Sequence, residues 1–295
     1  MVLLTPTSWT EYELIDTGGG EKLERFGKYI LRRPEPQAVW EKSTSDMEWE
    51  KLAHAMFKRE KDQQSESEKG KWILKPDMPN QWFIGYQWNG LNIRMRMGLT
   101  AFKHVGIFPE QAENWNYIYQ AIRNCKVDVP RVLNLFAYTG GASLAAKAAG
   151  ADVVHVDSVR QVINWSAENQ EASQLNGIRW VVEDAMKYIH REVKRGKTYH
   201  GIILDPPAYG RGPDGEKWVL EDGINELVKI CSQLLEKESS FMVLNLYSMG
   251  FSALIAEGLI KTHFSDILNP EFGELYLPDR SGKKLPLGVF LRFLR

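Results

Sequence analysis

Glycine or aspartate residues stand at the ends of four apolar segments of this 295-residue chain, a pattern typical of a ligand site. Gly140 and Gly141 follow the first segment, while Asp157, Asp184 and Asp205 stand at the ends of the next three. The carboxyl ends of parallel strands meet at one edge of an open α/β sheet, where ligands bind. Glycines let a ligand approach the backbone, and a helix start favours an anionic group. We therefore expect these residues to share one binding site.

The glycine turn reads Phe-Ala-Tyr-Thr-Gly-Gly over residues 136–141. It lacks the Gly-x-Gly-x-x-Gly spacing that cradles a dinucleotide pyrophosphate. Asp157 nevertheless stands where a Rossmann-type site binds ribose hydroxyls. A ligand with a ribose and a carboxylate but no phosphates fits this pattern, and S-adenosylmethionine is such a ligand. The alternative is a structural βαβ unit whose glycines only form a tight turn.

The second half of the chain predicts a parallel sheet, because strand-like and helix-like segments alternate with short connections. Strands are expected near 131–136, 152–156, 178–182, 199–205 and 240–246, and helices near 142–150, 159–175, 184–195, 220–237 and 250–263. The alternating segments 272–277 and 287–293 flank a turn-rich stretch and predict an antiparallel hairpin. An antiparallel strand at the end of a parallel sheet distinguishes the S-adenosylmethionine methyltransferase version of the doubly wound fold from the dehydrogenase version. The predicted fold class is therefore α/β, a doubly wound Rossmann-like methyltransferase sheet that ends in this hairpin, over residues 124–295.

The first part of the chain has a different pattern, which predicts a small β-rich (α+β) domain over residues 1–123. A strongly charged stretch near 46–70 predicts an exposed helical insert. Aromatic residues then interleave with Asn, Gln and Gly: Trp72, Trp82, Phe83, Tyr86 and Trp88. Such side chains can stack on nucleobases, but filling the core of the small domain is the favoured interpretation for most of them.

Composition excludes several classes of protein. No apolar run approaches the roughly 20 residues needed to span a bilayer, and the first residues do not form a secretion signal. Two cysteines, Cys125 and Cys231, predict neither a disulfide framework nor a metal site. We therefore expect a cytoplasmic protein with no membrane and no metal partner. Its oligomeric state is left open by the sequence.

The net charge of −1 removes the simplest argument for a nucleic-acid-binding protein, so any basic surface must be local. One candidate lies on the helix after Asp184, and a second on a strand and the loop that follows it. The first comprises Lys187, Arg191, Lys194 and Arg195, and the second Arg94, Arg96, Lys103 and His104. For the first group, a solvated helix face is the favoured interpretation.

Together, the glycine turn, Asp157, Asp184 and the Asp-Pro-Pro sequence at 205–207 resemble class I S-adenosylmethionine-dependent methyltransferases. More narrowly, they resemble the bacterial group related to methyltransferases of large-subunit ribosomal RNA. The segment 103–115 is similar to that group's Gly-(aromatic)-x-x-Gln segment, and the resemblance covers roughly residues 10–295. It implies an enzyme that uses S-adenosyl-L-methionine as cofactor and has ribosomal or transfer RNA as its expected partner.

The resemblance also implies the site residues. The cofactor-binding set is Phe136, Tyr138, Thr139, Gly140, Gly141, Ala142, Ser143, Asp157, Ser158, Asp184, Ala185 and Asp205. The catalytic set is Asp205, Pro206, Pro207 and Tyr209. Within these sets Asp157 would bind the ribose hydroxyls, Asp184 the adenine amine, and Tyr209 would form the acceptor wall.

One departure concerns cysteine, which relatives that methylate cytosine C5 need as a nucleophile near the tip of the fourth or fifth strand. Cys125 precedes the first strand of the predicted sheet and Cys231 lies in the middle of a predicted helix. The sequence therefore predicts methyl transfer to nitrogen or oxygen without a covalent step, where catalysis is largely positioning. Two alternatives stay open: a methyltransferase for a small molecule or a protein side chain, and a non-catalytic S-adenosylmethionine-binding module.

Overall fold

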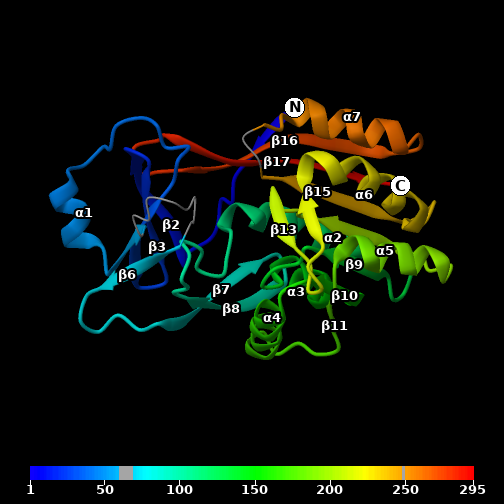
Figure 1. Ribbon diagram of the computed structural model, residues 1–295, viewed down its shortest axis with the longest axis horizontal. Coiled ribbons are helices and arrows are strands. Elements are labelled where there is room, and N and C mark those ends of the chain that lie inside the picture. The colour runs from blue at the N-terminus through cyan, green and yellow to red at the C-terminus, as the bar shows by residue number, and fades with distance from the viewer. Residues whose placement is uncertain (60–68, 248–249) are drawn as a thin grey trace.

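The computed structural model describes residues 1–59, 69–247 and 250–295 (Figure 1). A mixed eight-stranded sheet dominates the second half of the chain. In spatial order its strands are β1 (Val2–Leu4), β16 (Leu268–Pro278), β17 (Lys284–Leu294), β15 (Phe241–Leu246), β12 (Gly201–Leu204), β9 (Arg131–Leu135), β10 (Asp152–Asp157) and β11 (Arg179–Val182). Strands β15, β12, β9, β10 and β11 pair in parallel, whereas β17 pairs antiparallel with β15 and β16. The predicted doubly wound sheet and its terminal hairpin are confirmed.

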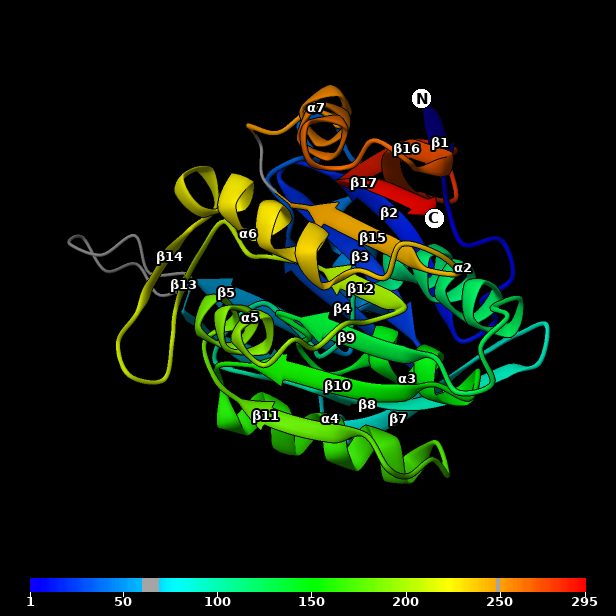
Figure 2. The same cartoon turned by 90° about the vertical axis from the view of Figure 1, so that its right-hand side faces the viewer.

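Helices cover both faces of this sheet (Figure 2). They are α2 (Ala112–Arg123), α3 (Gly141–Ala148), α4 (Arg160–Ala172), α5 (Ala185–Lys194), α6 (Leu220–Leu234) and α7 (Ala253–His263). Side chains of a strand alternate between two apolar cores: Val132 packs with α2 and α3, whereas Leu133 packs with α5, α6 and α7. Parallel strands buried on both faces read as continuous apolar runs, which explains why their positions could be predicted closely.

The first half of the chain contains a five-stranded sheet and a two-stranded ribbon. The sheet consists of β2 (Tyr12–Gly18), β3 (Glu21–Phe26), β4 (Tyr29–Pro34), β5 (Ala55–Arg59) and β6 (Gly70–Leu74), and the ribbon of β7 (Gln81–Trp88) and β8 (Leu91–Gly98). Trp82 and Tyr86 are buried in the core, as expected of most of these aromatics, but Phe83 is 41% exposed.

The expected helical insert near 46–70 is much shorter in the structure. Helix α1 (Asp46–Leu52) begins at a Ser45–Glu48 capping box and ends at Ala53, whose backbone is extended. The chain then pairs with β4 as strand β5, because Ala55 and Phe57 alternate into the core. The remainder of the insert, 60–68, lies outside the described residues. The division of the chain at residue 123 stays a prediction, and β1 already belongs to the large sheet.

The tip of the β16–β17 hairpin reaches the five-stranded sheet, as Figure 1 shows. Thr17 Oγ1 donates a hydrogen bond to Asp279 Oδ2 at 2.8 Å, and Lys283 Nζ donates to Asp16 Oδ1 at 3.0 Å. Burial alone would raise the pKa of Asp16, but hydrogen bonds from Lys283 and Trp49 hold this pKa well below its usual range. The hairpin therefore joins the two parts of the protein through buried polar contacts.

Candidate functional site

A pocket opens at the carboxyl ends of β9, β12 and β15. It is lined by residues of the glycine turn, of the two neighbouring strand tips, of β8 and of the segment that enters α2. Among the lining residues are seven of the predicted site residues: Phe136, Tyr138, Thr139, Gly140, Gly141, Ala142 and Asp205. The pocket therefore brings together the turn and the start of the Asp-Pro-Pro loop.

The turn between β9 and α3 has an unusual backbone. Phe136, Tyr138 and Gly140 have φ values of 54°, 48° and 91°, in the left-handed region that only glycine adopts without cost. The turn is held by the Tyr138 N–H, which donates to Asp157 Oδ2 at 2.9 Å, and by Ser166 Oγ, which donates to Tyr138 O at 2.8 Å. Strand β10 and helix α4, which carry Asp157 and Ser166, thus stabilise this strained conformation.

Gly141 serves packing as well as the pocket. A Cβ at this position would lie 2.5 Å from Cζ2 of Trp115, closer than any real contact. The missing side chain therefore makes room for the Trp115 indole, which brings α2 against the start of α3. Gly140 meets no comparable obstacle and is required by its positive φ.

Ser143, predicted to bind the cofactor, is fully buried and does not line the pocket. Its Oγ accepts a hydrogen bond from Asn134 Nδ2 at 2.9 Å and lies 3.0 Å from His155 Nδ1. On the other side of the ring, Ser166 Oγ lies 3.5 Å from His155 Nε2. Burial lowers the pKa of His155 to about 3, so this histidine is neutral. Ser143 therefore belongs to a buried network of polar side chains that ends at the Tyr138 carbonyl of the turn.

Asp157 and Ser158 lie at the tip of β10, beside the turn. The two carboxylate oxygens of Asp157 accept hydrogen bonds from the N–H groups of Tyr138 and Val159, each at 2.9 Å. Burial raises the pKa of Asp157, and these hydrogen bonds oppose that shift. Each oxygen retains a lone pair for a further donor, although neither residue lines the pocket.

Asp184 and Ala185 begin helix α5. Asp184 is the N-cap, and its Oδ1 accepts a hydrogen bond from the Lys187 N–H at 2.9 Å. Both residues are buried. Asp184 therefore has a structural role already, and its Oδ2 is the oxygen left for a ligand amine.

Asp205 follows β12 and lines the pocket, where it is partly exposed. Within the ranges that the structure describes, its carboxylate accepts no hydrogen bond. Burial raises its pKa to about 7, because a desolvated carboxylate without partners favours its neutral form. Asp205 is thus a carboxyl group with a pKa near neutrality and without a hydrogen-bond partner among the described residues.

The loop after Asp205 is held by a tryptophan that sequence reasoning missed. Trp218, in strand β14 (Lys217–Val219), donates its Nε1–H to Pro207 O at 2.7 Å. Its ring packs on Phe136 with 5.0 Å between centroids. Pro206 is buried, Pro207 is exposed, and Tyr209, which starts strand β13 (Tyr209–Arg211), is 52% exposed.

Three side-chain amides in the pocket were also missed: Gln111, Asn114 and Asn245. Gln111 Oε1 accepts hydrogen bonds from Asn114 Nδ2 at 3.0 Å and from Asn245 Nδ2 at 2.9 Å, and Asn114 also donates to Asn245 Oδ1. The available signals were the Gln of segment 103–115 and the polar Asn245 at the end of an apolar strand. These amides add donors and acceptors opposite the turn.

The basic group on α5 is largely engaged in ion pairs. Lys187 pairs with Asp214 and Glu216, Arg191 with Glu183, and Arg195 with Glu192. This pairing agrees with the favoured interpretation of a solvated helix face.

Neither cysteine lines the pocket. Cys231 is fully buried, and burial raises its pKa far above the usual range. Cys125 Sγ donates to Ser239 O at 3.3 Å.

Over residues 1–59, 69–247 and 250–295, the structure contains no helix long and apolar enough to cross a membrane. The same ranges hold no cluster of three His, Cys, Asp or Glu side chains suited to a metal ion.

The pocket and its rim fit a nucleoside with a charged amino-acid tail. The Gly140 backbone and the amide cluster provide hydrogen-bonding groups near the helix start, while Asp157 and Asp184 have unused acceptor sites at neighbouring strand tips. Carboxylates accept hydrogen bonds from ribose hydroxyls and from an adenine amine. The donor set suits S-adenosylmethionine better than a dinucleotide, because the three-glycine pyrophosphate cradle is missing.

Comparison with known proteins identifies the family and its cofactor. The family profile of S-adenosylmethionine-dependent methyltransferases matches residues 64–269. The crystal structure of a SAM-dependent methyltransferase from Agrobacterium tumefaciens is 36% identical, with a TM-score of 0.89 over 100% of this chain and 93% of that one. A methyltransferase structure solved with S-adenosylhomocysteine has the same fold at 20% identity, with a TM-score of 0.71 over 98% of this chain and 76% of that one.

A curated relative from Syntrophotalea carbinolica is ribosomal RNA large subunit methyltransferase K/L. It is 30% identical over 47% of this chain, and the chain spans only 19% of its length. The matched family range and the full-length match to the Agrobacterium protein show what kind of enzyme this is and which cofactor it uses. The chain belongs to the S-adenosylmethionine-dependent methyltransferases.

Proposed function

We propose that this enzyme methylates a nitrogen or oxygen atom of ribosomal or transfer RNA without a covalent enzyme–substrate intermediate. S-adenosylmethionine, when bound, supplies an electrophilic methyl group. The chain must then orient the acceptor atom and accept its proton. The observation that carries the proposal is Asp205, a pocket carboxyl with a pKa raised to about 7 by burial. A general base is most effective when its pKa is near the working pH.

The neighbours of Asp205 support an orienting role. Pro206 and Pro207 restrict the backbone of the loop, and Trp218 holds the Pro207 carbonyl. Tyr209 is exposed beyond them and is proposed as the acceptor wall, where an aromatic ring can stack on a base. Asp205 would accept a hydrogen bond from the acceptor amine or hydroxyl, align its lone pair and take its proton.

The absence of a cysteine from the pocket lining supports the non-covalent route. Cysteine nucleophiles act as thiolates, and the raised pKa of Cys231 keeps this thiol protonated. Attack by a nitrogen or oxygen lone pair requires no such group, only in-line positioning.

RNA is the favoured substrate class because curated relatives include ribosomal RNA large subunit methyltransferases from bacteria and an archaeon. This chain spans 19–34% of the length of those relatives, so the substrate is part of the proposal. The alternative is a small molecule or a protein side chain, which would suit the net charge of −1. A cytoplasmic location belongs to the same proposal.

For the cofactor, we propose that Asp157 binds the ribose hydroxyls and that Asp184 and Ala185 bind adenine. The glycine turn and the amide cluster would bind the methionine part. Ser143 would act indirectly, through its buried hydrogen bonds to Asn134 and His155.

Replacement of Asp157 by Ala should weaken binding of S-adenosylhomocysteine by about tenfold or more, that is by roughly 1.5–3 kcal/mol. The ribose loses its acceptor, and the turn loses its bond to Tyr138. Calorimetric titration measures the effect. Asp152→Ala is the matched control, because Asp152 is exposed at the opposite end of the same strand. Equal affinities of the two folded variants would refute the role given to Asp157.

Transfer of a labelled methyl group to RNA tests the substrate class. The enzyme should methylate RNA extracted from a strain that lacks its gene, and fail with RNA from the parental strain, whose target atoms are already modified. Mass mapping of nucleosides then identifies the acceptor. Incorporation into the protein or small-molecule fraction of the same extract, with none into RNA, would favour the alternative.

Replacement of Asp205 by Asn should lower the single-turnover rate by about 10²–10⁴ with little effect on cofactor affinity, as expected of a general base. The wild-type rate should rise with pH through about 7, and the variant should lose this dependence. Burial, together with the charges of Asp205 and Glu24, raises the pKa of Glu110 to about 8, close to that of Asp205. Glu110→Gln is therefore the necessary control for the pH dependence.

Thermal stability separates the catalytic role of Asp205 from capping of the local backbone. A raised pKa means that the folded protein prefers the protonated carboxyl. Its contribution to stability is complete below pH about 4 and is lost as pH rises through about 7. The melting temperature of Asp205→Asn should therefore equal or exceed that of the wild type at pH 8. A lower melting temperature with a normal rate per folded molecule would mean that Asp205 only caps its loop.

A Cys125→Ala, Cys231→Ala double variant should retain turnover per folded molecule, since no cysteine attacks the substrate. Some loss of stability is expected from the cavity at buried Cys231. Rates are compared after the folded fraction has been measured. Loss of activity with normal cofactor affinity and a native melting profile would support a covalent mechanism.

A further inference from the structure

The β7–β8 ribbon has two distinct faces. Side chains alternate across a strand, so Ile93 and Met95 are buried while Asn92 and Arg94 are exposed. Met95 lines the cofactor pocket. Arg94, its neighbour in the chain, lines a second pocket on the outer face. Neighbouring residues of one strand therefore line two different pockets.

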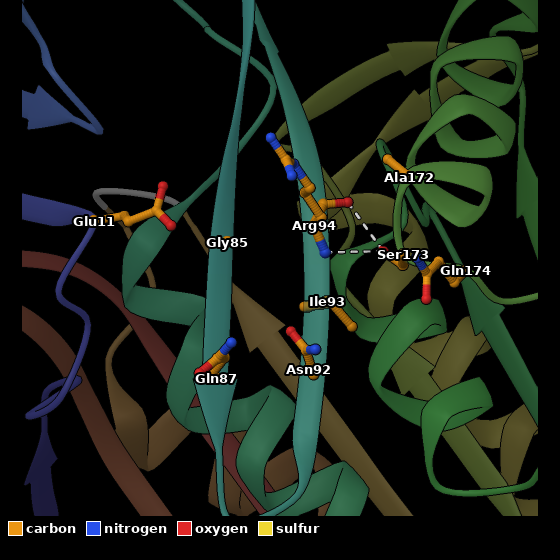
Figure 3. A pocket seen from close by; sticks show the side chains of 9 residues that line it. All are labelled: Glu11, Gly85, Gln87, Asn92, Ile93, Arg94, Ala172, Ser173 and Gln174. Carbon is orange, nitrogen blue, oxygen red and sulfur yellow. Dashed lines mark hydrogen bonds between the residues drawn. The ribbon is translucent and has the colours of Figure 1, made fainter.

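The second pocket has a volume of about 330 Å³, within the range of small-molecule sites. Figure 3 shows Gly85 at its centre, Glu11 on one side and the end of α4 on the other. Its polar lining also includes Gln87 and Asn92, which face each other across the ribbon. The site is a polar cavity, and none of the acidic residues at the strand tips lines it.

Two opposite charges border this pocket without neutralising each other. In the part of the chain that the structure describes, Arg94 has no carboxylate partner, and its guanidinium lies over the Phe83 ring, 5.6 Å from the centroid. The Glu11 side chain is exposed and likewise lacks a hydrogen-bond or ion-pair partner within these described ranges. A suitable ligand would offer donors to Glu11 and a flat surface to the Arg94–Phe83 stack.

Hydrogen bonds within the protein hold the walls of the pocket in place. Trp9 Nε1 donates to Gly85 O at 2.8 Å, and the Gly27 N–H donates to Glu11 O at 2.7 Å. On the other side, Ser173 Oγ accepts from the Arg94 N–H and donates to the Arg94 carbonyl, each at 2.9 Å. Such preorganisation lowers the cost of binding.

Gly85 leaves room for the Glu11 carboxylate above the ribbon. A Cβ at residue 85 would lie 3.1 Å from Glu11 Oε1, so a side chain there would crowd this oxygen. The floor of the pocket is therefore open where the acidic group projects.

We propose that this pocket binds an unpaired guanine of the RNA substrate. Guanine is the nucleobase with two adjacent N–H donors, on N1 and N2, that match the two oxygens of a carboxylate such as Glu11. Its plane would stack on the Arg94–Phe83 pair, the usual way in which proteins hold unpaired bases. The amides of Gln87 and Asn92 can bond the remaining edge. This inference rests on the proposed RNA function.

Fluorescence anisotropy with labelled 12-nucleotide RNAs tests the assignment, using the full-length protein saturated with S-adenosylhomocysteine. The RNAs are oligo-uridine and the same sequence with one central G or one central A. The G-containing RNA should bind tightest, by about tenfold. Arg94→Ala should weaken its binding by about five- to tenfold or more, the usual effect of removing a stacking partner. Glu11→Gln should abolish the preference for G over A.

Arg123→Ala is the matched control, because Arg123 is an exposed arginine at the end of α2. Cofactor affinity and melting temperature confirm that each variant is folded. If the wild type binds none of the RNAs, the guanine pocket is overturned, whereas the proposed RNA function fails only if extracted RNA also accepts no methyl group. If it binds RNA but Arg94→Ala behaves like Arg123→Ala, or the preference for G is absent or survives Glu11→Gln, only the guanine pocket is overturned.

Discussion

The left-handed backbone of the turn at residues 136–140 is the constraint on which the site depends. Phe136 and Tyr138 adopt positive φ values, each at a cost of order 1–3 kcal/mol. Asp157 and Ser166 offset this cost by bonding the two backbone groups of Tyr138. The same conformation lets Phe136 pack on Trp218, which holds the Pro207 carbonyl. One strained turn therefore shapes the cofactor side of the pocket and is coupled to the acceptor loop.

Buried polar groups in this protein fall into two kinds. Asp16 is surrounded by hydrogen-bond donors, and its pKa is held low although burial opposes this. Asp205 is only partly exposed in the pocket, yet no donor compensates its burial among the described residues, and its pKa rises. A satisfied carboxylate stabilises the fold, whereas an unsatisfied one is costly and is retained at sites that need a titrating group. This difference in surroundings distinguishes Asp16, which joins the hairpin to the five-stranded sheet, from Asp205, the candidate base.

The N-terminal part of the chain contributes to the site through packing. The β7–β8 ribbon supplies Met95 to the cofactor pocket, and its outer strand edge is covered by α4, where Asn169 Oδ1 accepts from the Arg96 N–H at 2.7 Å. An uncovered strand edge would leave backbone groups unpaired. The β16–β17 hairpin fastens the five-stranded sheet from the other end. Contacts at both ends thus connect the two halves of the chain.

The sequence by itself determined the parallel sheet and the terminal hairpin, and it indicated seven residues that line the pocket at the carboxyl ends of the strands. These features depend on local patterns: apolar runs, glycine spacing and acids at strand ends. It did not reveal that Gln111 and Asn114 meet Asn245, because such contacts join residues more than 130 positions apart. It also placed Ser143 in the cofactor-binding set, whereas its hydroxyl lies in the interior, and it extended one helix beyond Leu52 into strand β5. Tertiary packing decided these points, since partners distant in sequence determine which polar atoms are satisfied and which remain free to act.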